Sequence, residues 1–113
     1  MSGIAELKTA RIRELNDQLR CKASGGRIVV TAGIAALGTE TIKQVLTAVG
    51  RFSDFTDEND PWREHDCAML TVSGRRVLFK IDYYELELTA HSPDPSDPAV
   101  TARVMTVMLA EEY

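Results

Sequence analysis

Cysteine and histidine are scarce in this chain, which has two of each in 113 residues. Cys21 and Cys67 are too few and too far apart to form a C-x-x-C redox pair or a zinc ribbon. The longest apolar runs fall far short of the roughly 18 residues that a membrane span needs. No secretory signal pattern is found near residue 1. We therefore expect a cytoplasmic protein with reduced thiols and no membrane contact.

Motifs that mark catalytic and metal sites are also missing. There is no H-E-x-x-H, no G-x-S-x-G, and no EF-hand loop with its central glycine. The segment GIAALGTE at 33–40 has the glycine spacing of a phosphate-binding loop. However, Thr39 stands where that loop needs a lysine to reach the phosphates, so the glycines indicate a turn. We expect no cofactor.

Charge is unevenly distributed along the chain. Residues 1–51 carry eight Lys/Arg against four Asp/Glu, a net charge of +4, whereas residues 52–113 carry five against thirteen, a net charge of −8. The overall charge of −4 disfavours a dedicated nucleic-acid binder, whose affinity comes mainly from cations that neutralise phosphates. The length suits one domain over residues 1–113.

The N-terminal region predicts an amphipathic helix within residues 1–22. Its apolar positions fall in one sector of a 3.6-residue helix: Ile4, Leu7, Ile12, Leu15 and Leu19. Lys8 and Arg11 intrude on this narrow stripe. The helix could be peripheral to the domain, or its stripe could pair with a second copy, so a monomer and a homodimer both stay open.

The next two elements are a strand and a helix. The segment RIVVTAG at 27–33 is β-branched and bounded by glycines, which predicts a strand over 27–32 that is buried on both faces. Its direction in the sheet is left open. A second helix should begin near Thr39 and end at Gly50, with the core positions Ile42, Val45, Leu46 and Val49.

The segment CAMLTVSGRRVLFKIDYY predicts an antiparallel hairpin over about 66–84, with its turn at Ser73-Gly74. The apolar alternation favours the register in which opposite residues sum to 147. It sets Leu70 against Val77 and Ala68 against Phe79 on one face. On the other face Cys67 meets Lys80, and His65 meets Asp82 if the ladder extends that far.

The C-terminal third predicts one more helix. Residues 86–90 alternate and could form a separate strand or the tail of the hairpin, and HSPDPSDP should be a stiff surface connection. Asp97-Pro98 resembles a helix start, so the final helix should run to about Glu111. The predicted fold is α+β, in the order α-β-α-β-β-α, with a small sheet of three or four strands and the helices mainly on one face.

The acidic segment DENDPWREHD at 57–66 is the main candidate site. The favoured interpretation is a structural loop in which carboxylates cap turns and Trp62 covers the edge of the core. A metal site would draw on Asp60, His65 and Asp66, but the sequence does not favour one.

Two functional hypotheses follow. The first is a binding or regulatory protein that acts through a protein partner; its candidate surface residues are Asp60, Trp62, Glu64, His65, Asp66, Lys80, Asp82 and Tyr84. The alternative is a small metal-dependent or acid/base hydrolase that uses Glu64, His65 and Asp82, because a carboxylate beside the imidazole fixes its tautomer. The first hypothesis is favoured because no catalytic motif is complete.

Five ordered blocks carry a family resemblance: GGRIVVTAG, DFTDENDPWREHD, KIDYY, SPDPSDPAVT and RVMTVMLAEEY. Over about residues 16–113 the chain resembles a family of short bacterial proteins known as domain of unknown function 3768. The resemblance implies a small free-standing protein, similar to others encoded on plasmids and mobile elements, and it implies no activity. The residues that match its motifs include Asp60, Pro61, Glu64, His65, Asp66, Lys80, Asp82, Tyr83 and Tyr84.

Overall fold

The computed structural model describes residues 3–113, which contain three α-helices, four strands and one short 3-10 helix. The helices are α1 (Gly3–Lys22), α2 (Ala32–Ala35) and α3 (Thr39–Arg51). The strands are β1 (Arg27–Val30), β2 (Cys67–Val72), β3 (Arg75–Tyr84) and β4 (Ala102–Leu109), and the 3-10 helix is η1 (Ala110–Glu112).

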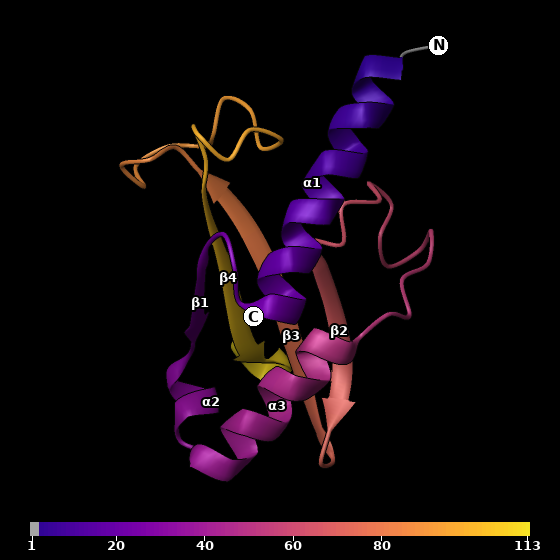
Figure 1. Ribbon diagram of the computed structural model, residues 1–113. Helices are drawn as coiled ribbons and strands as arrows, with labels where there is room; N and C mark the ends of the chain where they lie inside the picture. The colour runs from indigo at the N-terminus through magenta and orange to yellow at the C-terminus, as the bar shows by residue number, and fades with distance from the viewer. Residues whose placement is uncertain (1–2) are drawn as a thin grey trace.

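The strands form one mixed sheet in the order β1-β4-β3-β2. Strand β1 runs parallel to β4, whereas β4, β3 and β2 are antiparallel to their neighbours. The three α-helices lie on the same side of the sheet (Figure 1). The α+β class, the four-stranded sheet and the placement of the helices on one face are therefore confirmed.

The predicted hairpin register is also confirmed. Leu70 pairs with Val77 and Ala68 with Phe79. Ser73 and Gly74 have φ values of 52° and 79°, which suit a two-residue hairpin turn that needs two left-handed residues. The hydrogen bonding begins one residue before β2, because the Ile81 N–H donates a hydrogen bond of 2.7 Å to the Asp66 carbonyl.

The core lies between the helices and the inner face of the sheet. The apolar residues with the smallest exposure come from the helices and from the sheet: Leu19, Ile34, Val45, Val49, Val77, Phe79, Met105 and Val107, all at 0–1%. The 3.6-residue spacing on α3 and the two-residue spacing on β3 thus meet at one apolar interface. Met105 belongs to this core, and Met108 is buried at 5% exposure.

The predicted final helix is wrong, because residues 102–109 form strand β4. Three of its eight residues, Val104, Thr106 and Val107, are β-branched, and β-branched residues favour strands. Arg103, Met105 and Val107 are buried while Val104 and Thr106 are only half-buried, so the apolar residues serve two faces of a sheet. Apolar positions on both faces resemble a helix that is apolar all round.

The start that Asp97-Pro98 suggested for this helix is a turn in the structure. The Asp97 carboxylate accepts a hydrogen bond of 2.9 Å from the Ala99 N–H. Its carbonyl accepts another of 3.2 Å from the Val100 N–H. An aspartate that bonds backbone two residues on makes such turns without a helix.

Residues 86–90, for which two alternatives were open, form neither a separate strand nor the tail of the hairpin: Glu85 and Ala90 are joined by a backbone hydrogen bond of 2.9 Å, and Leu88 is left-handed at φ 65°. The prediction for the strand at 27–32 needs correction. Strand β1 is an edge strand and not a doubly buried one, since it pairs only with β4 and Val29 is 42% exposed. A β-branched run therefore indicates a strand here but does not indicate that the strand is central in the sheet.

The first helix is buried only in its C-terminal half. Ile12, Leu15 and Leu19 face the core, whereas Ile4 and Leu7 are 73% and 71% exposed. Figure 1 shows the N-terminal turns of α1 projecting beyond the strands. The predicted apolar stripe therefore exists, but only part of it is covered.

We expect Phe79→Ala to lower the free energy of unfolding by about 3–5 kcal/mol, because it leaves a cavity between the helices and the sheet. Leu7→Ala on the exposed end of α1 should change it by no more than about 0.5 kcal/mol. Urea unfolding followed by circular dichroism measures both. A small loss for Phe79→Ala would contradict the placement of this ring in the core.

Candidate functional site

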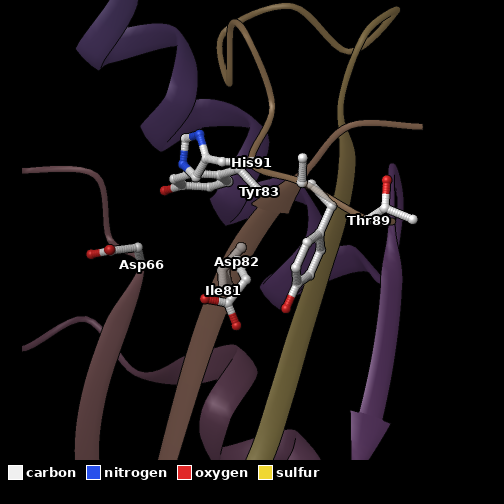
Figure 2. Close-up of a pocket in the computed structure, with 8 residues that line it drawn as sticks. Asp66, Ile81, Asp82, Tyr83, Thr89 and His91 are labelled. Carbon is white, nitrogen blue, oxygen red and sulfur yellow. The ribbon is translucent and has the colours of Figure 1, made fainter. Parts of the chain in front are cut away.

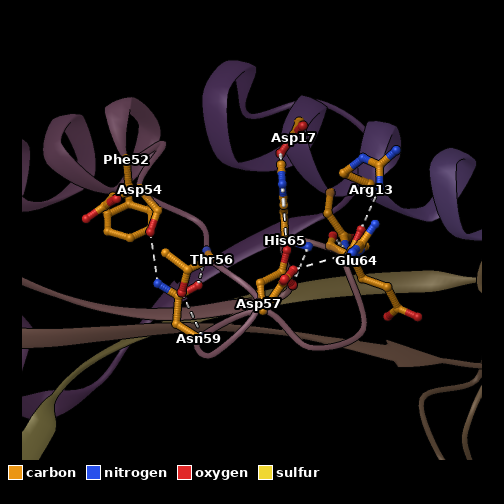
Figure 3. Close-up of polar contacts among 12 residues, drawn as sticks. Arg13, Asp17, Phe52, Asp54, Thr56, Asp57, Asn59, Glu64 and His65 are labelled. Carbon is orange, nitrogen blue, oxygen red and sulfur yellow. Dashed lines mark hydrogen bonds and ion pairs between the residues drawn. The ribbon is translucent and has the colours of Figure 1, made fainter.

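The acidic segment is an ordered loop between α3 and β2. Asn59 organises its first half: its Oδ1 accepts the Thr56 N–H at 2.8 Å, and its Nδ2 donates to the Asp54 carbonyl at 2.9 Å (Figure 3). The Asn59 N–H in turn donates to Thr56 Oγ1 at 3.2 Å. Such reciprocal side-chain bonds stabilise a turn without help from a ligand.

Asp60 is the buried carboxylate of this loop, with an exposure of only 4%. Its Oδ1 accepts the His65 N–H at 3.1 Å, and its carbonyl accepts the Arg63 N–H at 3.1 Å. Arg63 and His65 are left-handed, with φ of 58° and 55°. Because this conformation is strained for such residues, Asp60 is the group that holds the turn closed.

The His65 ring packs between two carboxylates and an aromatic ring. Its Nδ1 lies 2.9 Å from Asp17 Oδ1, and its Nε2 lies 3.7 Å from Asp60 Oδ2. The ring stacks on Phe55 with centroids 3.8 Å apart and planes 5° apart. The predicted His65–Asp82 pair is therefore wrong: the left-handed turn at His65 ends the strand geometry before that position.

Asp17 also connects the loop to the helices. Its Oδ1 accepts a hydrogen bond of 2.9 Å from Arg20, whose guanidinium also donates to the carbonyls of Val49 and Phe52 at 3.0 and 2.7 Å. These carbonyls belong to the last turn of α3 and its C-cap, where backbone acceptors lack helical partners. Arg20 thus ties α1 to the end of α3 while its partner Asp17 holds His65.

A second polar cluster is buried under α1. Asn16, at 0% exposure, donates through Nδ2 to the Glu64 carbonyl at 2.9 Å and to Tyr83 Oη at 2.8 Å, while its Oδ1 accepts from Arg103 Nε at 2.7 Å. The Tyr83 hydroxyl donates to Glu64 Oε1 at 2.7 Å. Arg103 donates to the Pro95 carbonyl and lies over the Tyr83 ring.

Burial shifts the acid–base behaviour of this cluster. Desolvation raises the pKa of the Glu64 carboxyl, and the negative charges of Asp66 and Asp60 add to the rise despite the Tyr83 hydrogen bond. Desolvation also raises the pKa of Tyr83 and lowers that of Arg103. The cluster therefore costs desolvation energy, which its mutual hydrogen bonds offset.

A cavity of about 470 Å³ opens at the end of β3, next to these clusters. Figure 2 shows Asp82, Tyr83 and His91 around it, with Asp66 on the β2 side. Other lining residues are Ile81, Tyr84, Thr89 and Ala90. Its two carboxylates differ in their partners: Asp82 pairs with Lys80 at 3.1 Å, whereas no side chain within residues 3–113 forms an ion pair or a hydrogen bond with the Asp66 carboxylate.

Asp66 is the carboxylate of this cavity whose pKa is raised. Burial raises the pKa of its carboxyl, and the charges of Asp60 and Asp82 raise it further. A nearby cation stabilises the charged form of such a carboxyl and lowers its raised pKa. The cavity is thus better suited to a cationic group than to an anion.

The candidate residues of the hydrolase hypothesis have separate partners. Glu64 bonds Tyr83, His65 bonds Asp17, and Asp82 pairs with Lys80. Within residues 3–113, no group of three or more His, Cys, Asp or Glu side chains is arranged to hold a metal ion. Trp62 does not cover the core as predicted, since it is 74% exposed.

Sequence reasoning missed the residues of α1 that organise the site. Asn16 and Arg20 follow Ile12 at four-residue steps, so they lie on the buried sector of the helix. Polar side chains on an apolar face are a signal of buried hydrogen bonding, and this one was present in the sequence. Nothing local indicated that Asp17, from the same helix, would reach His65.

The fold and the loop together define a small α+β protein with a carboxylate-rich end. The model of the family described as "Protein of unknown function (DUF3768)" matches residues 30–112, so the chain belongs to this family. No curated protein and no solved structure matches the chain. No helix within residues 3–113 combines the length and the apolar character needed to cross a membrane.

We expect Asp60→Ala to lower the free energy of unfolding by about 1–3 kcal/mol, because it leaves the half-buried His65 N–H without its acceptor. Asp57→Ala provides the matched control, since the Asp57 side chain is 88% exposed and pairs with the exposed Arg63. That variant should change stability by about 0.5 kcal/mol or less. Equal effects in urea unfolding would show that Asp60 has no special part in closing the loop.

The raised pKa of Glu64 predicts a pH effect on stability. The pKa of Glu64 is near 4.5 in the unfolded state and higher in the folded state, so the folded state keeps the proton to a higher pH. The contribution of Glu64 to the stability of the fold is therefore lost as pH rises through the raised pKa. Glu64→Gln keeps an acceptor for Tyr83 without the charge. Its gain in stability relative to wild type should therefore be larger at neutral pH than below pH 4.5. A relative loss at neutral pH would contradict this prediction.

Proposed function

We propose that the protein is a small binding module that recognises a protein partner through its carboxylate-rich end. In this proposal the cavity between Asp66 and Asp82 receives a lysine or arginine side chain of the partner. The observation that carries it is the presence of two carboxylates in one cavity of about 470 Å³ beside the ends of β2 and β3. A cationic side chain fits this volume and offsets the charge of Asp66, while Asp82 already has Lys80 beside it at 3.1 Å.

The lining of the cavity supports a cation in two ways. The Asp66 carboxylate has no side-chain hydrogen bond or ion pair within residues 3–113, and burial raises the pKa of its carboxyl. Tyr83, Tyr84 and His91 also line the cavity, and tyrosine rings attract ammonium and guanidinium groups through their faces. Guanidinium can in addition bond a carboxylate through two parallel N–H groups, which favours arginine over lysine.

Trp62 supplies a second feature of a binding surface. Its side chain is 74% exposed on the loop that ends at Asp66. An exposed tryptophan gains much from burial against a partner, and tryptophan is enriched among the residues that dominate binding energy. The proposal thus combines one apolar anchor with one charged cavity.

Hydrolysis is the less favoured function for this end of the molecule. Glu64 and His65 each have a structural hydrogen-bond partner, and neither lines the cavity of Asp66 and Asp82. Association with a mobile element, which the family resemblance implies, is compatible with a partner-binding role and stays a prediction.

The proposal is tested with an arginine-rich peptide and the same peptide with citrulline in place of arginine. Titration of ¹⁵N-labelled protein should shift the amide signals of Asp66, Asp82, Tyr84 and His91 with the arginine peptide, and much less with the citrulline one. We expect Asp66→Asn to weaken binding by about tenfold, since a charge-assisted hydrogen bond is lost.

The matched control is Glu111→Gln, which removes the same charge from an exposed position beyond the other end of β4. It should leave the affinity for the arginine peptide nearly unchanged. Equal weakening by both variants would mean that only the net charge matters, and the cavity would not be the binding site. Equal shifts with the two peptides would also contradict the proposal.

A further inference from the structure

The outer edge of β2 has free backbone groups. The hydrogen bond from the Ile81 N–H to the Asp66 carbonyl fixes which β2 residues bond to β3. Because these positions alternate along an antiparallel strand, Ala68, Leu70 and Val72 bond inward. The N–H and C=O groups of Cys67, Met69 and Thr71 therefore point outward. No backbone hydrogen bond within residues 3–113 covers this outer side.

The sequence of β2 does nothing to protect this edge. Its six residues, CAMLTV, contain no charge, no proline and no glycine. Proteins usually protect an edge strand with lysine, proline or a bulge, because an open edge pairs with other strands. The other edge, β1, is shorter at four residues and begins with an exposed arginine. The two edges are therefore not equivalent.

We propose that β2 pairs with β2 of a second copy, giving a two-fold dimer with a continuous eight-stranded sheet. The outward groups select the register. With Met69 opposite Met69 of the second copy, Cys67 lies opposite Thr71 and Thr71 opposite Cys67. All three outward residues then form hydrogen-bonded pairs, which gives about six new backbone hydrogen bonds. The strand is thus complementary to itself about Met69.

This register also continues an apolar row. Met69 pairs with Leu78 and Leu78 with Met108, so the three side chains run across one face of the sheet. Leu78 and Met108 are each 5% exposed, whereas Met69 at the edge is 41% exposed. The row ends at Met69, whose sulfur accepts a hydrogen bond of 2.6 Å from Arg76 and whose exposed part a second methionine across the dyad would cover. Cross-strand apolar pairs of this kind stabilise sheets.

Charge is complementary about the same dyad. One end of the hairpin carries Arg75 and Arg76, and the other end carries Asp66 and Asp82. Antiparallel pairing of two copies brings the basic end of one to the acidic end of the other. In the proposed register Arg75 lies two strands, roughly 10 Å, from Asp66 of the second copy, within reach of an arginine side chain. A parallel arrangement would instead place like charges together.

The first test measures mass by sedimentation equilibrium from micromolar to near-millimolar concentration. Wild type should form dimers. Met69→Lys should raise the dimer dissociation constant by at least about tenfold, because two ammonium groups would meet at the dyad. The matched control is Val29→Lys on β1, where Val29 is 42% exposed on the other edge; it should leave dimerisation unchanged.

The second test reports the register directly. In a Cys21→Ser background, Thr71→Cys places a thiol opposite Cys67 of the second copy, and the Cα separation of a hydrogen-bonded pair suits a disulfide. Mild oxidation should give a covalent dimer linked between positions 67 and 71. Val29→Cys in the same background should give little of it. Circular dichroism on each variant confirms that it is folded.

Several results would overturn the proposal. Wild type could remain monomeric over the whole concentration range. Dimers could resist Met69→Lys but dissociate with Leu7→Lys, which would place the contact on the exposed end of α1. A folded Thr71→Cys variant could also fail to form the 67–71 disulfide under oxidation. The mass and cross-linking readouts do not depend on peptide binding, so this proposal and the proposed function can fail separately.

Discussion

The hydrogen bonds of Asn16 are the interaction on which the rest of the structure depends. This one fully buried amide connects α1 to the loop through the Glu64 carbonyl, to β3 through Tyr83 and to β4 through Arg103. Each partner is itself a polar group that would be costly to bury alone. Since the cluster brings together segments 87 residues apart in sequence, it fixes the angle at which α1 crosses the sheet and the position at which the loop enters β2.

The acidic segment divides its carboxylates between two tasks. Asp60 is buried and satisfied by backbone, so its charge maintains the loop. Asp66 comes six residues later, where the chain becomes a strand, and the charge of Asp60 contributes to the raised pKa of its carboxyl. The loop therefore keeps one carboxylate near another at some cost in stability. Proteins commonly accept such a cost at binding sites, where the ligand removes it.

The sequence predicted those features that depend on local periodicity. The hairpin register followed from alternation about Ser73-Gly74, and the core face of α3 followed from its four-residue spacing. Two kinds of feature escaped. Strand β4 is apolar on both faces because it lies inside the sheet, and single-sequence periodicity does not separate this from a buried helix. The partner of His65 depends on how α1 crosses the loop, a long-range contact that no local pattern contains.

The position of β4 has a consequence for the order of folding. Within residues 3–113, strand β1 pairs with β4 alone, although about 70 residues separate the two strands along the chain. During synthesis the first strand must wait, unpaired, until the last strand has left the ribosome, while the β2–β3 hairpin can close early. Contacts of such long sequence separation slow folding. We therefore expect the hairpin to act as the template on which β4 docks, with β1 added last.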